Sequence, residues 1–125
     1  MELYRSIIED LRSWKERPDR KPLILKGARQ TGKTWILEHF GHTDFEHVAS
    51  FNFDKDESLN EIFDNTKDPE RIVQQLKLHT DNPILPHKTL IVFDEIQECN
   101  KALNALKYFC EDAPEYTVVA AGSLL

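Results

Sequence analysis

Apolar residues recur along the chain at two different spacings, which predicts helices alternating with strands. Near the N-terminus, Leu3, Ile7, Leu11 and Trp14 follow helical spacing, so residues 2–17 are expected to form an amphipathic helix. Stripes at the same spacing predict four further helices, at residues 36–40, 59–63, 72–76 and 102–110. The first of these is expected to end at Gly41, because glycine is common just beyond a helix C-terminus.

Shorter apolar runs predict four strands, at residues 23–25, 48–53, 89–93 and 117–121. The run at 89–93 is unbroken, which is typical of a strand buried on both faces of a parallel sheet. Because strands alternate with helices, we expect an α/β fold with three αβα layers around a parallel sheet. Residues 1–20 should form a helix packed on the core, and residues 21–125 the core itself.

The segment between the first predicted strand and the next helix matches the phosphate-loop pattern GxxxxGK(S/T), with Gly27, Ala28, Arg29, Gln30, Thr31, Gly32, Lys33 and Thr34. Glycines allow the backbone to wrap closely around phosphate oxygens, and the following helix adds the positive end of its dipole. Lys33 would bind the β- and γ-phosphates, and the Thr34 hydroxyl would ligate Mg²⁺. The motif therefore predicts a site for ATP with Mg²⁺.

The third predicted strand ends in two acids, Asp94 and Glu95. A strand buried on both faces can present Asp94 at its carboxyl end, where open α/β sheets place their ligands. We expect Asp94 to hold Mg²⁺ through water, since this ion keeps much of its hydration shell. Glu95 would activate the water that attacks the γ-phosphate.

The strand at 48–53 between the loop and these acids resembles the arrangement of the additional-strand, catalytic-glutamate division of P-loop NTPases. That resemblance implies that the fourth strand lies between the phosphate-loop strand and the strand ending in Asp94. It also implies a polar sensor residue at the end of the fourth strand, for which Ser123 is the candidate.

Several stretches together resemble AAA-type prokaryotic ATP-binding proteins, often described only as predicted ATPases, which carry a C-terminal domain of unknown function. The matching stretches are residues 20–23 leading into the loop, 52–54, 94–97, 106–109 with Glu111 and Pro114, and 121–125. The resemblance implies a regulatory ATPase that uses ATP and Mg²⁺. It carries functional roles over to Gly32, Lys33, Thr34, Asp94, Glu95 and Ser123.

The sequence leaves the roles of two residues near these motifs open. Gln97 could orient water or partner Glu95, or it could be a surface turn residue. Arg29 could reach phosphate or a neighbouring subunit, or it could be an exposed arginine.

The chain stops directly after the fourth strand, so we expect a fragment truncated there, without lid helices, second sensor or arginine finger.

The net charge of −6 is unevenly distributed. Residues 1–34 hold nine Lys and Arg against five Asp and Glu, and the remainder of the chain is strongly acidic. A basic region at the phosphate loop would attract a polyanion, whereas the acidic remainder argues against a wide nucleic-acid surface.

No apolar run approaches the roughly 20 residues that span a bilayer. With two isolated cysteines, the expected compartment is the cytoplasm.

The sequence leaves alternatives to ATP hydrolysis. A non-catalytic nucleotide switch or interaction module is the main one, and a small-molecule kinase would share the loop. A GTPase is disfavoured because neither DxxG nor (N/T)KxD is present. Expected partners are ATP, the remainder of the protein's own chain, a second copy in a homo-oligomer, and an unidentified protein or nucleic acid.

Overall fold

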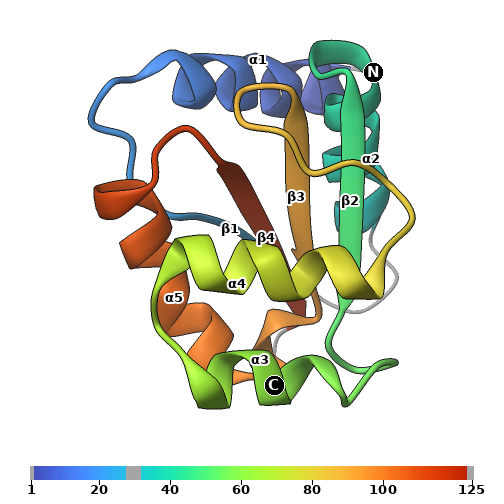
Figure 1. Ribbon diagram of the computed structural model, residues 1–125. Coiled ribbons are helices and arrows are strands. Elements are labelled where there is room, and N and C mark those ends of the chain that lie inside the picture. The colour runs from blue at the N-terminus through green and yellow to red at the C-terminus, as the bar shows by residue number, and fades with distance from the viewer. Residues whose placement is uncertain (1, 28–31, 124–125) are drawn as a thin grey trace.

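The computed structural model describes residues 2–27 and 32–123 and confirms the α/β fold, with a parallel sheet between helices. Its elements in chain order are α1 (Glu2–Glu16), β1 (Leu23–Gly27), α2 (Lys33–Asp44), β2 (His47–Asn52), α3 (Leu59–Asn65), α4 (Pro69–Leu76), η1 (Lys77–His79), β3 (Thr89–Asp94), η2 (Ile96–Glu98), α5 (Asn100–Asp112) and β4 (Thr117–Ser123). Figure 1 shows these elements as a ribbon.

The sheet has the strand order β1-β4-β3-β2, and each neighbouring pair is parallel. The fourth strand therefore lies between the phosphate-loop strand and the strand ending in Asp94, as the resemblance implied. The two central strands, β3 and β4, are buried along most of their length, which explains their continuous apolar sequence.

Each face of the sheet carries its own hydrophobic cluster. Helices α3, α4 and α5 pack on one face, and α1 and α2 pack on the other (Figure 1). Phe93 of β3 lies at the centre of the first cluster, where its ring contacts those of Phe51, Phe53, Phe63 and Phe109. Such aromatic contacts add to the free energy gained from burial alone. Helices thus cover both faces of the sheet, as the predicted three-layer arrangement requires.

The prediction that α2 ends at Gly41 is wrong, because the helix continues to Asp44. Gly41 is buried inside the helix, against the sheet. A Cβ at this position would lie 2.4 Å from Val48 Cγ2 and 3.1 Å from Leu90 Cδ2. The glycine therefore allows α2 to approach the sheet closely, and it does not terminate the helix.

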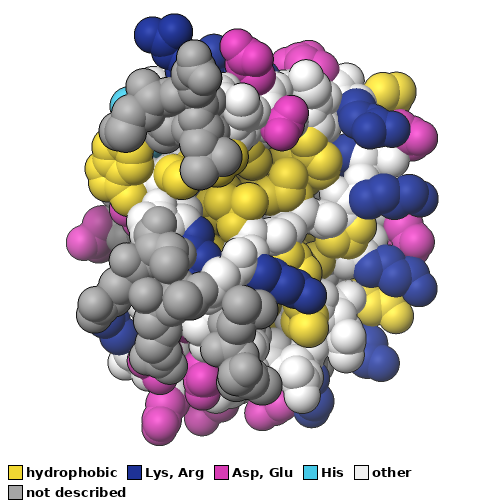
Figure 2. Space-filling model, turned by 180° about the vertical axis from the view of Figure 1, so that it is seen from behind, with side chains coloured by type: hydrophobic (Ala, Val, Ile, Leu, Met, Phe, Trp, Pro, Cys, Tyr) yellow, Lys and Arg dark blue, Asp and Glu magenta, His cyan; other side chains and the backbone are white. Residues whose placement is uncertain are grey.

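Helix α1 packs on the core through Ile8 and Leu11, which are 7% and 1% exposed. Strand β1 is less well covered: it pairs only with β4 among the described strands, and Leu23, Ile24 and Leu25 remain partly exposed. Figure 2 views the molecule from behind and shows hydrophobic side chains at the centre of that face, with Lys and Arg along one side. No helix within residues 2–27 and 32–123 combines the length and apolar character needed to cross a membrane.

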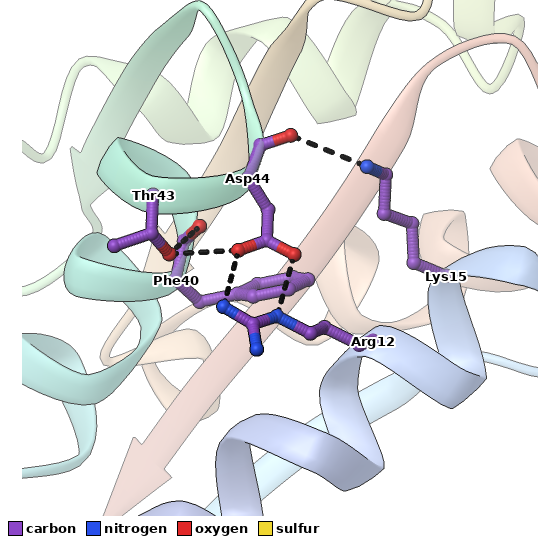
Figure 3. Close-up of polar contacts among 5 residues, drawn as sticks. All are labelled: Arg12, Lys15, Phe40, Thr43 and Asp44. Atoms are coloured by element: carbon purple, nitrogen blue, oxygen red, sulfur yellow. Dashed lines mark hydrogen bonds and ion pairs between the residues drawn. The ribbon is translucent and has the colours of Figure 1, made fainter.

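A polar cluster joins α1 to the end of α2 (Figure 3). The Arg12 guanidinium donates two hydrogen bonds to the Asp44 carboxylate, at 2.8 and 3.1 Å, and Thr43 Oγ1 donates a third at 2.8 Å. Lys15 Nζ donates to the Asp44 carbonyl oxygen at 3.2 Å. Burial alone would raise the pKa of Asp44, but the hydrogen bonds from Arg12 and Thr43 and the charges of Arg12 and Lys15 outweigh it and lower the pKa.

We expect the Asp44→Asn variant to lower the free energy of unfolding by about 1 kcal/mol at neutral pH, because half of the bidentate contact and its charge are lost. A carboxylate with a lowered pKa stabilises the folded state above its unfolded pKa, near 4. That contribution disappears as the pH falls through the lower folded pKa, so the two proteins should converge in stability there. Urea unfolding at pH 7 and at decreasing pH measures this difference. The control is Asp19→Asn, whose side chain is 78% exposed; an equal loss in both variants would contradict the prediction.

Candidate functional site

The carboxyl ends of the four strands meet along one edge of the sheet. The register places Asn52 of β2 beside Asp94 of β3, and Gly27 of β1 beside Ser123 of β4. Because β3 and β4 are neighbours, Asn52, Asp94 and Ser123 all lie at the carboxyl ends of adjacent strands. Parallel α/β sheets bind ligands at this edge, so the fold brings the predicted residues to a suitable position.

Helix α2 begins at Lys33, within the predicted phosphate loop of residues 27–34. Gly32 precedes it with φ 83° and ψ 9°, a left-handed conformation that glycine adopts without steric cost. Although charged, Lys33 is only 8% exposed. The amino end of α2 thus presents its first backbone N–H groups and the Lys33 charge on the same side as the row of strand ends. Four predicted loop residues, Ala28, Arg29, Gln30 and Thr31, lie outside the described residues.

Thr34 and Asp94 are in direct contact. Thr34 Oγ1 donates a hydrogen bond to Asp94 Oδ1 at 2.8 Å, and Asn52 Nδ2 donates to Asp94 Oδ2 at 3.3 Å. The Glu95 backbone N–H also donates to Asp94 Oδ1, at 3.0 Å. The carboxylate of Asp94 is therefore held in one orientation by groups from α2, β2 and the end of β3.

A cavity of about 280 Å³ opens beside these residues. Its lining residues are Lys33, Thr34, Asn52, Asp54, Lys55, Asp94 and Glu95. Among the described residues, the lining thus combines two lysines with three carboxylates, and it gathers α2, the loop after β2 and the loop after β3 around one space. The predicted residues Lys33, Thr34, Asp94 and Glu95 all belong to it.

Glu95 adopts φ 54° and ψ 48°, a left-handed conformation that is uncommon for a residue with a side chain. Its carboxylate accepts hydrogen bonds from the Ser123 hydroxyl, at 2.6 Å to Oε1 and 3.1 Å to Oε2. Gln97 Nε2 lies 3.5 Å from Glu95 Oε2. The predicted sensor residue and the predicted catalytic acid are therefore side by side, although 28 positions separate them in the sequence.

The donor set at Thr34 and Asp94 fits Mg²⁺. Hydroxyl and carboxylate oxygens are the hard ligands that this ion prefers, and it is commonly held by one or two carboxylates together with substrate phosphates. Within the described part of the chain, no group of three or more His, Cys, Asp and Glu residues gathers to hold a metal ion. A metal at this edge would thus depend on phosphate and water for its remaining ligands.

A larger cavity, of about 720 Å³, lies between β1, α3 and α5. Its lining includes Ile24, Phe63, Leu103 and Tyr108, and none of the predicted site residues that the structure describes. Among the described residues of its lining, Asp64 is the single carboxylate, so it lacks the carboxylate pair found at the end of β3. Chemistry rather than size therefore identifies the smaller cavity as the candidate site.

Sequence reasoning missed three residues of the small cavity, Asn52, Asp54 and Lys55. Asn52 Oδ1 accepts hydrogen bonds from the backbone N–H groups of Asp54 and Lys55, both at 2.9 Å, so it shapes the loop after β2 as well as contacting Asp94. The sequence did hold a signal for Asn52, because it is a polar residue at the end of an apolar strand, on the side of the sheet where the two motifs lie. For Lys55 the sequence carried no such signal, because its position depends on how the loop folds.

Comparison with known proteins agrees with this architecture. The solved structure titled "Structure of C. elegans PCH-2" is similar to the chain with a TM-score of 0.55 at 12% sequence identity. The similarity covers 97% of this chain and 36% of that one, so the chain spans about a third of PCH-2. At this identity the likeness concerns the fold. No curated protein sequence matches the chain significantly.

The family comparison is more direct. The AAA domain family matches residues 19–125, which include the phosphate loop, both acids at the end of β3 and the whole of β4. The match thus covers the entire sheet and each element that lines the small cavity. The chain belongs to the AAA domain family, whose members are nucleotide-binding ATPase domains.

Proposed function

We propose that the chain binds ATP with Mg²⁺ in the small cavity and hydrolyses it to ADP and phosphate. The observation that carries this proposal is the convergence of Lys33, Thr34, Asp94 and Glu95 on one space of about 280 Å³. These residues come from separate elements, so the convergence is a property of the fold and does not follow from the motif matches.

In this proposal the segment 27–34 surrounds the phosphates with its backbone N–H groups, and Lys33 binds the β- and γ-phosphates. Thr34 and Asp94 hold Mg²⁺, since their oxygens already lie 2.8 Å apart. Bound Mg²⁺ would neutralise charge that develops on the phosphate oxygens. Asn52 keeps the Asp94 carboxylate directed toward Thr34 through its hydrogen bond to the other oxygen.

Glu95 is proposed to accept a proton from the water that attacks the γ-phosphate. Its position next to Asp94 places a second carboxylate on the lining of the cavity. The hydrogen bond from the Ser123 hydroxyl supports an assignment of Ser123 as a residue that orients Glu95 and senses the phosphate. An oriented base contributes roughly 10²–10⁴-fold to the rate of a proton transfer.

One observation favours the alternative of a non-catalytic nucleotide switch. Both carboxylate oxygens of Glu95 are engaged by Ser123, which would limit their access to water in this arrangement. If ATP binding did not release them, the chain would bind nucleotide and change conformation without turnover. The two functions share one site and differ only in what Glu95 does.

We also propose the narrower assignment that the sequence resemblance implies: a prokaryotic regulatory ATPase that carries a C-terminal domain, forms homo-oligomers and acts on a protein or nucleic-acid partner. Strand β1, with apolar residues partly exposed at the sheet edge, supports contact with further protein. The free state of Cys99 and Cys110 is consistent with a reducing compartment, the cytoplasm.

The test is calorimetric titration of the chain with ATP and with GTP, each with Mg²⁺ and with EDTA, followed by measurement of phosphate release. We expect heat of binding with ATP that weakens on Mg²⁺ removal, and phosphate release above the background. Absence of heat with ATP would contradict the proposal, and preference for GTP would contradict the adenine assignment. Binding without phosphate release would favour the switch.

A further inference from the structure

Gln97 connects the ends of two strands. It lies in η2, immediately after β3, and its Oε1 accepts a hydrogen bond from the backbone N–H of Ser123 in β4 at 3.0 Å. Its Nε2 lies 3.5 Å from Glu95 Oε2. One amide group thus contacts both the end of β4 and the carboxylate at the cavity, and its side chain is half-buried.

Gly122 makes room for this side chain. A Cβ at position 122 would lie 3.2 Å from Gln97 Oε1 and 3.2 Å from Ile96 Cγ2, closer than ordinary contact. The glycine therefore lets the Gln97 amide sit directly against the β4 backbone. A turn residue exposed to solvent would need no such space.

The contacts on Glu95 converge from two sides. The Ser123 hydroxyl donates to its carboxylate from β4, and the Gln97 amide approaches Oε2 from η2. The Glu95 backbone is in the left-handed region, and such a conformation persists only where surrounding contacts hold it. Gln97 contacts both Glu95 and Ser123.

We infer that Gln97 is a positioning residue that holds the Glu95 carboxylate in place for the reaction. This inference rests on the proposed ATP hydrolysis, because it assigns Gln97 a part in the work of Glu95. The Nε2 group of Gln97 restrains Glu95 Oε2, and Oε1 of Gln97 is itself held by the backbone N–H of Ser123 in β4. Gln97 is not among the described residues that line the cavity, so its proposed effect is on Glu95 and not through contact with the nucleotide.

The experiment compares Gln97→Met and Gln97→Glu with the wild-type chain in the presence of ATP and Mg²⁺. Methionine keeps the length of the side chain and removes both hydrogen-bonding functions. Glutamate keeps an oxygen that accepts from the Ser123 N–H, but it loses the donor and places a like charge beside Glu95. We expect kcat to fall about 10-fold in Gln97→Met and at least as far in Gln97→Glu, consistent with loss of a hydrogen bond to a charged group. KM and the calorimetric Kd for ATP should stay within about 2-fold.

The matched control is Gln74→Met, which changes an exposed glutamine of α4 and should leave kcat and Kd unchanged. Near-normal kcat in Gln97→Glu together with low kcat in Gln97→Met would overturn the inference, because the acceptor for β4 would then suffice. Equal activity of all variants, or a loss that appears in Kd alone, would also overturn it. A wild-type chain that binds ATP without releasing phosphate would overturn the proposed function itself, and a hydrolysing wild type with unchanged Gln97 variants would overturn only the role of Gln97.

Discussion

The Glu95→Gln variant is expected to bind ATP as tightly as the wild-type chain and to hydrolyse it at least about 100-fold more slowly. Glutamine has the same shape as glutamate and can still accept a hydrogen bond from Ser123, but it cannot take a proton from water. Asp94, Thr34 and Lys33 are unchanged, so the contacts proposed for phosphate and Mg²⁺ remain. Calorimetry with ATP and Mg²⁺ measures binding, and single-turnover phosphate release measures the chemical step.

The control for this experiment is Glu98→Gln, the same chemical change three residues later in the chain. Glu98 is exposed and does not line the cavity. The Glu98→Gln variant should hydrolyse ATP at the wild-type rate. Unchanged turnover in Glu95→Gln would remove Glu95 from the mechanism, whereas a wild-type chain that binds ATP without turnover would favour the switch alternative.

The Lys33→Ala variant is expected to lose ATP affinity by at least about 100-fold, because a nearly buried ammonium group is removed from the place where the phosphates are proposed to bind. Among the described lining residues, the other positive charge is on Lys55, which lies on a loop and would not replace Lys33. If Lys33 contacts the β-phosphate, the affinities for ATP and ADP should both fall. If it contacts only the γ-phosphate, mainly the affinity for ATP should fall. Titration with both nucleotides measures the difference.

Lys77→Ala is the matched control, since Lys77 is exposed and lies outside the cavity. Circular dichroism and thermal unfolding establish that both variants keep the fold. Retention of wild-type ATP affinity by folded Lys33→Ala would contradict the assignment of the nucleotide to this cavity. In that case the larger cavity beside β1 would be the next candidate.

The sequence by itself determined the helices and strands, and it identified most of the residues that meet at the small cavity. Helical and strand spacings predicted each helix and strand of the sheet layers, with boundaries that differ by a few residues. Gly27, Lys33, Thr34, Asp94 and Glu95 were all identifiable, because each belongs to a short motif whose members are adjacent in the chain. Signals of this kind are local, and propensity, periodicity and turn chemistry report them well.

The tertiary structure decided the relations among residues that are distant in the chain. Gly41 reads as a helix end in sequence, but packing against Val48 makes it an internal position of α2. Asn52 meets Asp94 only because β2 and β3 are neighbours in register, and Gln97 meets Ser123 only because β4 follows next to β3. The resemblance already implied that β4 lies beside β3, but the register, which decides which side chains meet, depends on packing over the whole sheet and cannot be read from any single segment.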